Sequence, residues 1–435
     1  MHPAAALGAT HDAKLPLAFI AFGIGSLAHA LACLALEPSL ILQPHISPGV
    51  LSLVHAWVPG FLVSVCLGAC YQMMPVVLGV PLACGGWRRW AHLSAHGVGV
   101  TILISGFTRG HYEWVAAGGA LVALGIVSFA HSAWRTFANS PRRDAIAWSF
   151  PISATWLVAT VVLGVVMAVD RRWGLMGLPA MRLLPVHAHI GLAGFFLTLL
   201  QGVAFQLVPM FTMGELRRPR FVTGGLVATQ VGLVCLASGL VFGVHAVALF
   251  GAGVLAGGIV SSGVAFFATL HSRRRKKLEP SLTSFAIGAA LVPVAAIFGL
   301  ILLATRVANE TPSVVPAYGI VIIAGALSFV VMGMLGKIVP FLVWMTAYGP
   351  KVGRQKVPVA AALSSKACER AWLIAHAAGV ALAVVAAANG SAVGARIAAW
   401  ILTAGGLIYF WNLVRVARHL LRRGPFAPVT PVFQT

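Results

Sequence analysis

Two histidines that lie two positions apart at the start of a long apolar stretch are the clearest candidates for chemistry in this chain. They are His187 and His189, in the segment LPVHAHIGLAGFFLTLLQGVAFQLVPMF. An imidazole placed in hydrocarbon costs free energy unless it is hydrogen-bonded or ligated. Neutral imidazole is also a common ligand of haem iron and of other metals. The pair therefore predicts a haem or metal site inside a membrane.

The spacing around these histidines occurs at two other places in the chain. His55 is followed by Gln after 17 residues and by Pro after 20, and His189 is followed by the same residues at the same distances. A third stretch, PAYGIVIIAGALSFVVMGMLGKIVPFLVW, has Tyr318 at the position of His187, Ile320 at that of His189 and Lys337 at that of the Gln. Repeats of this kind are typical of membrane proteins with quasi-symmetric architecture.

The composition predicts that helices crossing a membrane position these residues. Of the 435 residues, 59% are hydrophobic and only 9% are charged. A spanning helix needs roughly 20 mainly apolar residues, and twelve stretches meet this need. They are approximately 15–36, 50–79, 91–108, 114–134, 147–169, 184–213, 222–243, 246–270, 282–304, 313–346, 371–389 and 395–420.

Twelve helices and three related segments together predict the domain organisation. We expect an all-α integral membrane protein with one polytopic domain over residues 1–435. Three four-helix quasi-repeats would cover approximately 15–138, 147–272 and 282–420. The second helix of each repeat then carries the related motif.

The basic residues predict the orientation of the chain. If the loops alternate between two sides, 23 Lys and Arg residues fall on one side and 6 on the other, with Lys337 inside a helix. The positive-inside rule places the basic side in the cytoplasm. We therefore expect a multi-pass protein of a bacterial-type inner (plasma) membrane with both termini in the cytoplasm. The basic loops are then interpreted as contacts with anionic lipids and not as a nucleic-acid surface.

The segment HAHIGLAGFFLTLLQGVAFQLVP resembles a helix of the catalytic subunit (subunit I) of haem–copper oxidases. That subunit has twelve helices in three quasi-repeats, and one of them carries His-x-His with a Pro 20 residues after the second His. The segment is also similar to the opening helix of the NnrS family, haem-containing membrane proteins associated with nitric oxide. The resemblance covers the whole chain in topology but only these helices in motif.

The resemblance implies one or two bound haem b groups in electron transfer or nitric oxide and respiratory chemistry, with a cytochrome or a quinol as electron donor. The oxidases have three further histidines that bind copper, and the stretch 222–243 contains no histidine. We therefore do not expect copper, nor an oxygen reductase, because no Asp or Glu lies in the middle of a predicted helix to relay protons. The sequence leaves open whether the protein is an enzyme.

Two ways of pairing the histidines stay open. Residues two apart on a helix project about 200° from each other, so His187 and His189 should serve different clefts. By the rule of the oxidase family, His55 and His187 share one haem iron, and His189 faces a second cleft beside Tyr318. The alternative is that His55 pairs with His189 and that His187 is a hydrogen-bonding residue.

Several weaker candidates accompany these histidines. Arg171 and Arg172 lie before the stretch 184–213, where they could bind haem propionates or form an ordinary interfacial loop. Cys66 and Cys70 have the soft sulfur ligands that Cu(I) prefers, and they also fit a contact between helices. The segment WRRWAHLSAH, with His92 and His96, is interpreted first as an aromatic and basic belt at the membrane interface.

The alternative function is a transporter of a metal or a small solute built on the same repeat symmetry. Transporters have broken helices near the midplane and usually a buried charge beside the site. The predicted histidines lie near the outer surface, and the one predicted buried charge, Lys337, lies near the inner one. The sequence therefore favours the haem protein.

Overall fold

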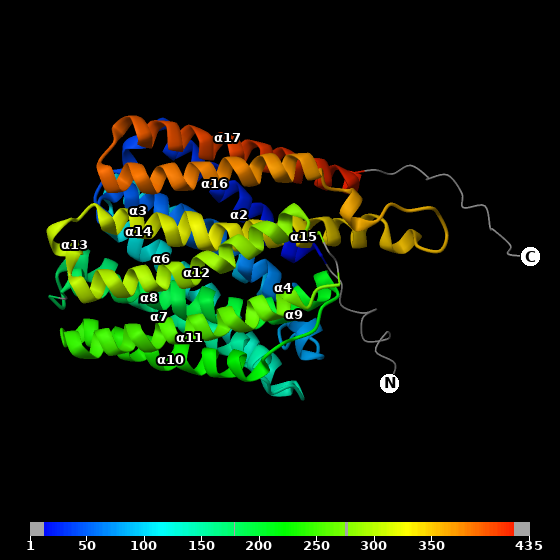
Figure 1. Cartoon of the computed structure of the whole chain (residues 1–435), viewed down its shortest axis with the longest axis horizontal. Coiled ribbons are helices and arrows are strands. Elements are labelled where there is room, and N and C mark those ends of the chain that lie inside the picture. The colour runs from blue at the N-terminus through cyan, green and yellow to red at the C-terminus, as the bar shows by residue number, and fades with distance from the viewer. Residues whose placement is uncertain (1–12, 178, 275–276, 422–435) are drawn as a thin grey trace, which may run out of the picture.

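The computed structural model describes residues 13–177, 179–274 and 277–421, and these residues form helices and no strand. The long helices run side by side along the longest axis of the molecule (Figure 1). α2 begins and α17 ends at the same end of this bundle. The predicted all-helical membrane fold is confirmed at this level.

Eleven helices of the described residues are long and apolar enough to cross a membrane. Three of them are composite, because a π-helical segment joins two α-helices. The eleven are α2 (Lys14–Leu36), α3–η2–α4 (Pro48–His55, Ala56–Val63, Ser64–Leu78), α6 (Tyr112–Asn139), α7 (Ala145–Trp173), α8–η3–α9 (Ala180–His189, Ile190–Leu197, Thr198–Thr212), α10 (Pro219–Phe242), α11 (His245–His271), α12 (Pro280–Thr305), α14–η4–α15 (Val314–Ile320, Val321–Leu327, Ser328–Ala347), α16 (Lys366–Asn389) and α17 (Ala392–Ala417).

One further long helix, α5 (Gly86–Arg109, 24 residues), occupies the predicted stretch 91–108 but is not among the eleven. Its first turns carry Arg88, Arg89, His92 and His96, which make it less apolar than its neighbours. At 1.5 Å per residue it is long enough to span a bilayer. The twelfth span therefore stays a prediction.

Short elements complete the described chain. The 3₁₀ segment η1 (Pro38–Ile41) lies between α2 and α3, and α13 (Val307–Glu310) lies between α12 and α14. Between α15 and α16 run η5 (Gly349–Lys351) and η6 (Ala360–Ala362), and η7 (Arg418–Leu421) extends α17.

Glycines allow neighbouring helices to approach closely, most clearly between α10 and α11. A Cβ on Gly232 would lie 2.3 Å from the backbone nitrogen of Leu255, and a Cβ on Gly251 would lie 2.2 Å from that of Leu236. Small residues at such contacts are typical of membrane helices, which associate largely by van der Waals packing.

The three composite helices share a local irregularity. η2 begins directly after His55, η3 directly after His189 and η4 directly after Ile320. These are the three residues that occupy the same position in the three repeated segments of the sequence. π-Helical segments are rare, and they are frequent at functional sites because they redirect the side chains around them.

A hydroxyl side chain follows each π-helical segment and donates to the carbonyl five residues earlier. Ser64 donates to Pro59 (3.2 Å), Thr198 to Ala193 (3.4 Å) and Ser328 to Ile323 (2.7 Å); each of these distances joins Oγ or Oγ1 to a carbonyl oxygen. These bonds satisfy backbone carbonyls that the wider π turn leaves without their usual donor.

A polar side chain of the next long helix contacts each π-helical segment or the hydroxyl that follows it. The His96 Nε2 of α5 lies 2.9 Å from the Ser64 Oγ, and the Gln230 Nε2 of α10 donates to the Thr198 Oγ1 at 3.0 Å. In the third composite helix, the His376 Nε2 of α16 lies 2.8 Å from the Ala324 carbonyl oxygen. The same kind of contact thus occurs three times in the bundle.

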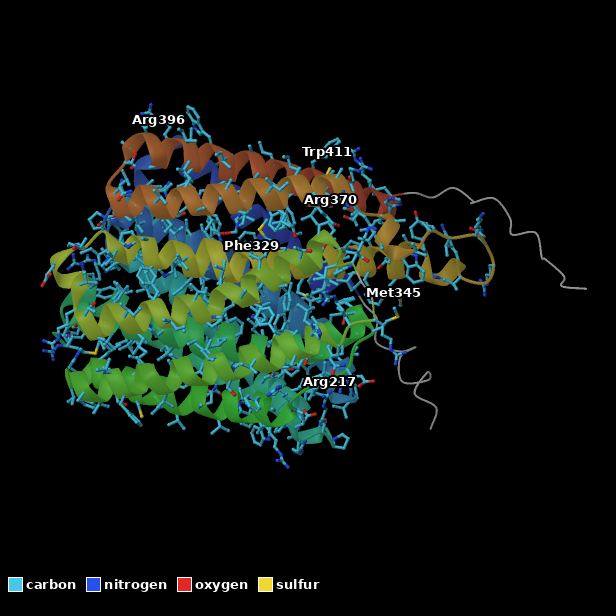
Figure 2. All side chains as sticks on the ribbon, in the orientation of Figure 1. Arg217, Phe329, Met345, Arg370, Arg396 and Trp411 are labelled. Carbon is cyan, nitrogen blue, oxygen red and sulfur yellow. The ribbon has the colours of Figure 1, made fainter. Side chains whose placement is uncertain are left out.

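The loops alternate between two ends of the bundle. At the first, here named the basic end, Arg142 at the start of α7 donates to the Gln206 side chain near the end of α9. At the other, the histidine end, Arg172 at the end of α7 bonds to Glu113 at the start of α6. Figure 2 shows Arg217 and Arg370 toward the basic end and Arg396 at the histidine end.

Lys337 was predicted to be a buried charge near the inner surface. Its ammonium forms an ion pair with the carboxylate of Glu279, which precedes α12, and lies 5.9 Å from the centre of the Phe211 ring. Both side chains are mostly buried, so the pair joins α12 to α15 and offsets the cost of burying each charge.

Candidate functional site

A large cavity opens among the helices and reaches the histidine end. Its volume is about 970 Å³, and its wall is mainly apolar. His55, His187, His189 and Tyr318 all line it. They come from α3, α8 and α14, the first parts of the three composite helices, which lie near one end of the bundle (Figure 1). A cavity of this size and lining accommodates a large, mainly apolar ligand.

His55 ends α3 and is held by its own helix. Its Nδ1 lies 2.7 Å from the Leu51 carbonyl oxygen, and its ring packs against Phe107 with 4.6 Å between ring centres. A carbonyl only accepts, so Nδ1 carries the proton and Nε2 keeps its lone pair. Histidine ligands of metals commonly have this arrangement, because the second hydrogen bond fixes the ring and the tautomer.

His187 faces His55 across the cavity. The ring centres are 6.5 Å apart and the ring planes differ by 23°. With metal–nitrogen bonds of about 2 Å and roughly 1 Å from each nitrogen to its ring centre, two imidazoles on opposite sides of one metal have centres roughly 6 Å apart. The observed separation fits a shared metal atom, as in one of the two pairings that the sequence leaves open.

The surroundings of His187 also suit a ligand. A Cβ on Gly164 of α7 would lie 2.9 Å from the His187 Cε1, so only a residue without a side chain leaves room for the ring here. The His187 Nδ1 is buried and makes no hydrogen bond of normal geometry, although the Thr160 carbonyl lies close by.

His189 is held in the same way as His55. Its Nδ1 lies 2.7 Å from the Pro185 carbonyl oxygen, which leaves the Nε2 lone pair free. The sequence predicted that His187 and His189 serve separate clefts. In the structure both line the same cavity.

Tyr318 reaches the cavity from α14 and packs against α12. A Cβ on Gly299 would lie 2.4 Å from the Tyr318 hydroxyl oxygen, and the Phe298 ring meets the tyrosine ring edge-on at 5.6 Å. Tyr318 lines the same cavity as His189, and a separate second cleft for this pair stays a prediction.

Arg171 and Arg172 lie elsewhere. They belong to the last turn of α7 and not to a loop, and neither lines the cavity. Arg172 pairs with Glu113 at 3.0 Å, and the Arg171 guanidinium lies 5.6 Å from the centre of the Tyr112 ring. Both arginines thus tie α7 to the start of α6 at the surface.

Polar residues that the sequence did not single out form the rim of the cavity. Gln43 and His45 come from the loop before α3, His245 begins α11, and Arg306 follows α12. Arg306 has a left-handed backbone, with φ of 55°, which is uncommon for a residue with a side chain. Burial lowers the pKa of His45, so its ring is neutral at neutral pH. Arg306 is therefore the cation that the cavity offers to an anionic ligand.

The other predicted candidates have different surroundings. His92 and His96 do not lie in an interfacial belt, because both are buried between α4, α5 and α6; the exposed belt residues are Trp87 and Trp90. Cys66 and Cys70 are unpaired thiols of α4. Among the described residues, no three His, Cys, Asp or Glu side chains gather to hold a metal ion.

The donor set fits a haem better than a bare metal ion. The cavity offers two facing imidazoles, a third imidazole with a free Nε2, a mainly apolar wall and one arginine at the rim. A mononuclear metal site would need three or four protein ligands on one ion. A haem supplies four nitrogens itself and needs only axial ligands from the protein.

No protein-family model and no curated protein matches the sequence, so the function is argued from the residues of the site.

Proposed function

We propose that this chain is a haem b-binding membrane protein of the haem–copper oxidase subunit I type, without the copper site, that acts in electron transfer or nitric oxide and respiratory chemistry. The observation that carries the proposal is the pair of imidazoles, His55 and His187, that face each other 6.5 Å apart across the cavity. The bound haem would supply one-electron chemistry at its iron.

In this proposal the chain holds the haem by three kinds of contact. His55 and His187 would hold the haem iron, because the helix carbonyl fixes the first ring and Gly164 makes room for the second. The apolar wall encloses the ring system and excludes water. Arg306 would bind the propionates at the rim, a role that the sequence analysis considered for Arg171 and Arg172 beside an ordinary interfacial loop.

His189 and Tyr318 form the second part of the cavity. A second haem, or a small apolar molecule such as nitric oxide, would meet the free Nε2 of His189 there. The electron donor in this proposal is a cytochrome or a quinol, and the helices contact membrane lipid around the bundle. The membrane is a bacterial-type inner membrane with the basic end in the cytoplasm.

The three repeats of four helices are part of the proposal. Three observations support them: π-helical segments start at the three aligned residues, hydroxyls follow each segment, and a polar side chain of the next helix reaches each one. With α5 as a twelfth span, each repeat has the same order of helices.

A transporter of a metal or small solute is the second candidate. The observation in its favour is that three long helices depart from α-helical geometry midway, and transporter sites lie at such interruptions. A transporter would bind its solute among the histidines and would carry no haem.

Haem analysis of the purified, full-length protein tests the proposal against the transporter. The protein should be coloured after expression with ample haem and should show the sharp reduced bands of six-coordinate haem b. A preparation that stays colourless and takes up no added haem would contradict the proposal and favour the transporter.

A further inference from the structure

A second group of titratable side chains lies between the cavity and the basic end, in α4 and α5. The Tyr71 hydroxyl lies 2.8 Å from the His92 Nδ1, and the His96 Nε2 lies 2.9 Å from the Ser64 Oγ. The rings of His92 and His96 are one helical turn apart, with 6.1 Å between their centres. The four side chains thus form a column along the contact between the two helices.

This column is fully enclosed. His92 is 2% exposed and His96 is 0% exposed. Phe19 of α2 covers both rings, at 5.1 and 6.1 Å between ring centres. On the α6 side, a Cβ on Gly125 would lie 2.7 Å from the His92 Cδ2. Burying an imidazole costs free energy unless it is hydrogen-bonded, and here the Tyr71 and Ser64 hydroxyls each supply one partner.

The hydrogen bonds define the protonation of each ring. The His96 Nε2 also faces the Pro59 carbonyl at 3.2 Å, and a carbonyl only accepts, so Nε2 carries the proton and Nδ1 keeps a lone pair. If the Tyr71 hydroxyl donates to the His92 Nδ1, the proton of His92 is on Nε2. The His92 Nε2 and the His96 Nδ1 are both buried without a partner. The His92 Nε2 is then a donor without an acceptor, and the His96 Nδ1 is an acceptor without a donor.

The two ends of the column have different surroundings. Around Tyr71 the titratable and charged groups are Cys70, Cys84 and Arg89, at the basic end. His96 lines the cavity that holds His55 and His187. Among the residues that the structure describes, the other neighbours of the two rings are uncharged: α2 presents Phe19 and Phe22, and α6 presents Gly125 and Phe129.

We propose that Tyr71, His92 and His96 conduct protons between the basic end and the cavity, with Ser64 positioning the His96 ring. A proton accepted by the His92 Nδ1 from the Tyr71 side is matched by release of the proton on Nε2. It passes to the His96 Nδ1 through one water molecule or a rotation of the ring, because the rings are too far apart for a direct hydrogen bond. His96 lines the cavity and then releases its Nε2 proton into it, while Ser64, whose hydroxyl donates to the Pro59 carbonyl, holds the ring in place. An imidazole can relay a proton in this way because it binds on one nitrogen and releases from the other.

The inference rests on the proposed function, since the change of charge that draws a proton inward is the reduction of haem iron in the cavity. The test uses the full-length, haem-loaded protein in lipid vesicles. The haem is reduced rapidly, and a pH-indicating dye in the medium follows proton uptake while absorbance follows reduction.

Tyr71→Phe and His96→Gln are the test variants. Tyr71→Phe removes only a hydroxyl, and His96→Gln keeps a neutral donor for Ser64 but cannot relay a proton. Both should slow proton uptake about 10²-fold and leave the oxidised haem spectrum unchanged. Tyr409→Phe is the matched control, since its buried hydroxyl donates to the Met332 carbonyl (2.9 Å) away from the cavity; it should take up protons at the wild-type rate.

Each outcome is decisive. Wild-type rates of proton uptake in both test variants, or no uptake by the wild type on reduction, overturn the proton path and leave the haem site intact. An equally slow proton uptake in Tyr409→Phe also overturns the proton path, because the effect then comes from a general loss of packing. A protein that binds no haem overturns the proposed function and the proton path together.

Discussion

Histidines occupy two contrasting environments in this molecule. His55 and His189 at the cavity are each held by a backbone carbonyl of their own helix and present a free Nε2 to an open space. His92 and His96 are buried in the core and meet hydroxyl side chains of another helix, and of the two only His96 borders the cavity. The residue type is the same, but the first arrangement is that of a ligand and the second that of a relay or a structural partner.

The two kinds of histidine differ in the group that hydrogen-bonds to the ring: a carbonyl of the same helix for His55 and His189, and a hydroxyl of another helix for His92 and His96. A local carbonyl at position i−4 fixes a ring without engaging another element, so the other nitrogen can bind a ligand. A partner on another helix makes the ring part of the packing, so its loss disturbs the fold. Each of the following predictions tests one side of this difference.

The largest effect is expected at the cavity, from His55→Ala. Loss of an axial ligand leaves five-coordinate iron, so the low-spin haem signal should disappear. Low-temperature absorption and electron paramagnetic resonance of the purified protein measure this. His45→Ala, at the rim of the same cavity, is the control and should keep the signal; a low-spin spectrum that survives His55→Ala would remove His55 from the site.

In the core, His92→Leu should destabilise the protein by about 1–3 kcal/mol, because the buried Tyr71 hydroxyl loses its partner. Denaturant unfolding of the haem-free protein in detergent, followed by tryptophan fluorescence, measures the change. His55→Leu in the same haem-free protein should cost less than about 1 kcal/mol, since its ring faces the cavity. An equal loss of unfolding free energy in His92→Leu and His55→Leu would show that the two environments do not differ in this way.

Arg306→Gln should weaken haem binding about tenfold, because a charged hydrogen bond to a carboxylate is lost. Titration of the haem-free protein with haem measures the affinity. Arg171→Gln is the matched control, because that side chain packs on Tyr112 outside the cavity. A larger loss from Arg171→Gln than from Arg306→Gln would return the propionate role to the arginines at the end of α7.

The smallest effect is expected from Gly164→Ala. The new Cβ would meet the His187 ring and turn it, which should change the electron paramagnetic resonance g-values while the haem stays bound. Gly253→Ala on α11 is the control, since a Cβ there meets nothing within 4 Å. An unchanged spectrum in Gly164→Ala would mean that His187 does not touch the haem.

The sequence predicted the helices and the three related segments because apolar runs and polar interruptions are visible in one dimension. The predicted stretch 313–346, for example, is the composite helix Val314–Ala347. The π-helical segments could not be predicted, since one additional residue in a turn leaves no mark in an apolar run such as IGLAGFFL.

The site was predicted in part. His55, His187, His189 and Tyr318 line one cavity because their aligned positions bring them to the same depth. Arg306, one of the few basic residues of the histidine end, also lines this cavity, but the sequence did not single it out because no motif includes it. His92 and His96 were assigned to an interface because Trp87 and Trp90 beside them are exposed; the buried partners Tyr71 and Ser64 lie on a helix that the local sequence does not reveal.

The central claim, that His55 and His187 hold one haem iron, is tested most directly by comparing electron paramagnetic resonance spectra of His187→Ala and His189→Ala. The account predicts that His187→Ala loses the low-spin haem signal and that His189→Ala keeps it. The opposite result, with the signal lost in His189→Ala and kept in His187→Ala, would contradict the account and pair His55 with His189.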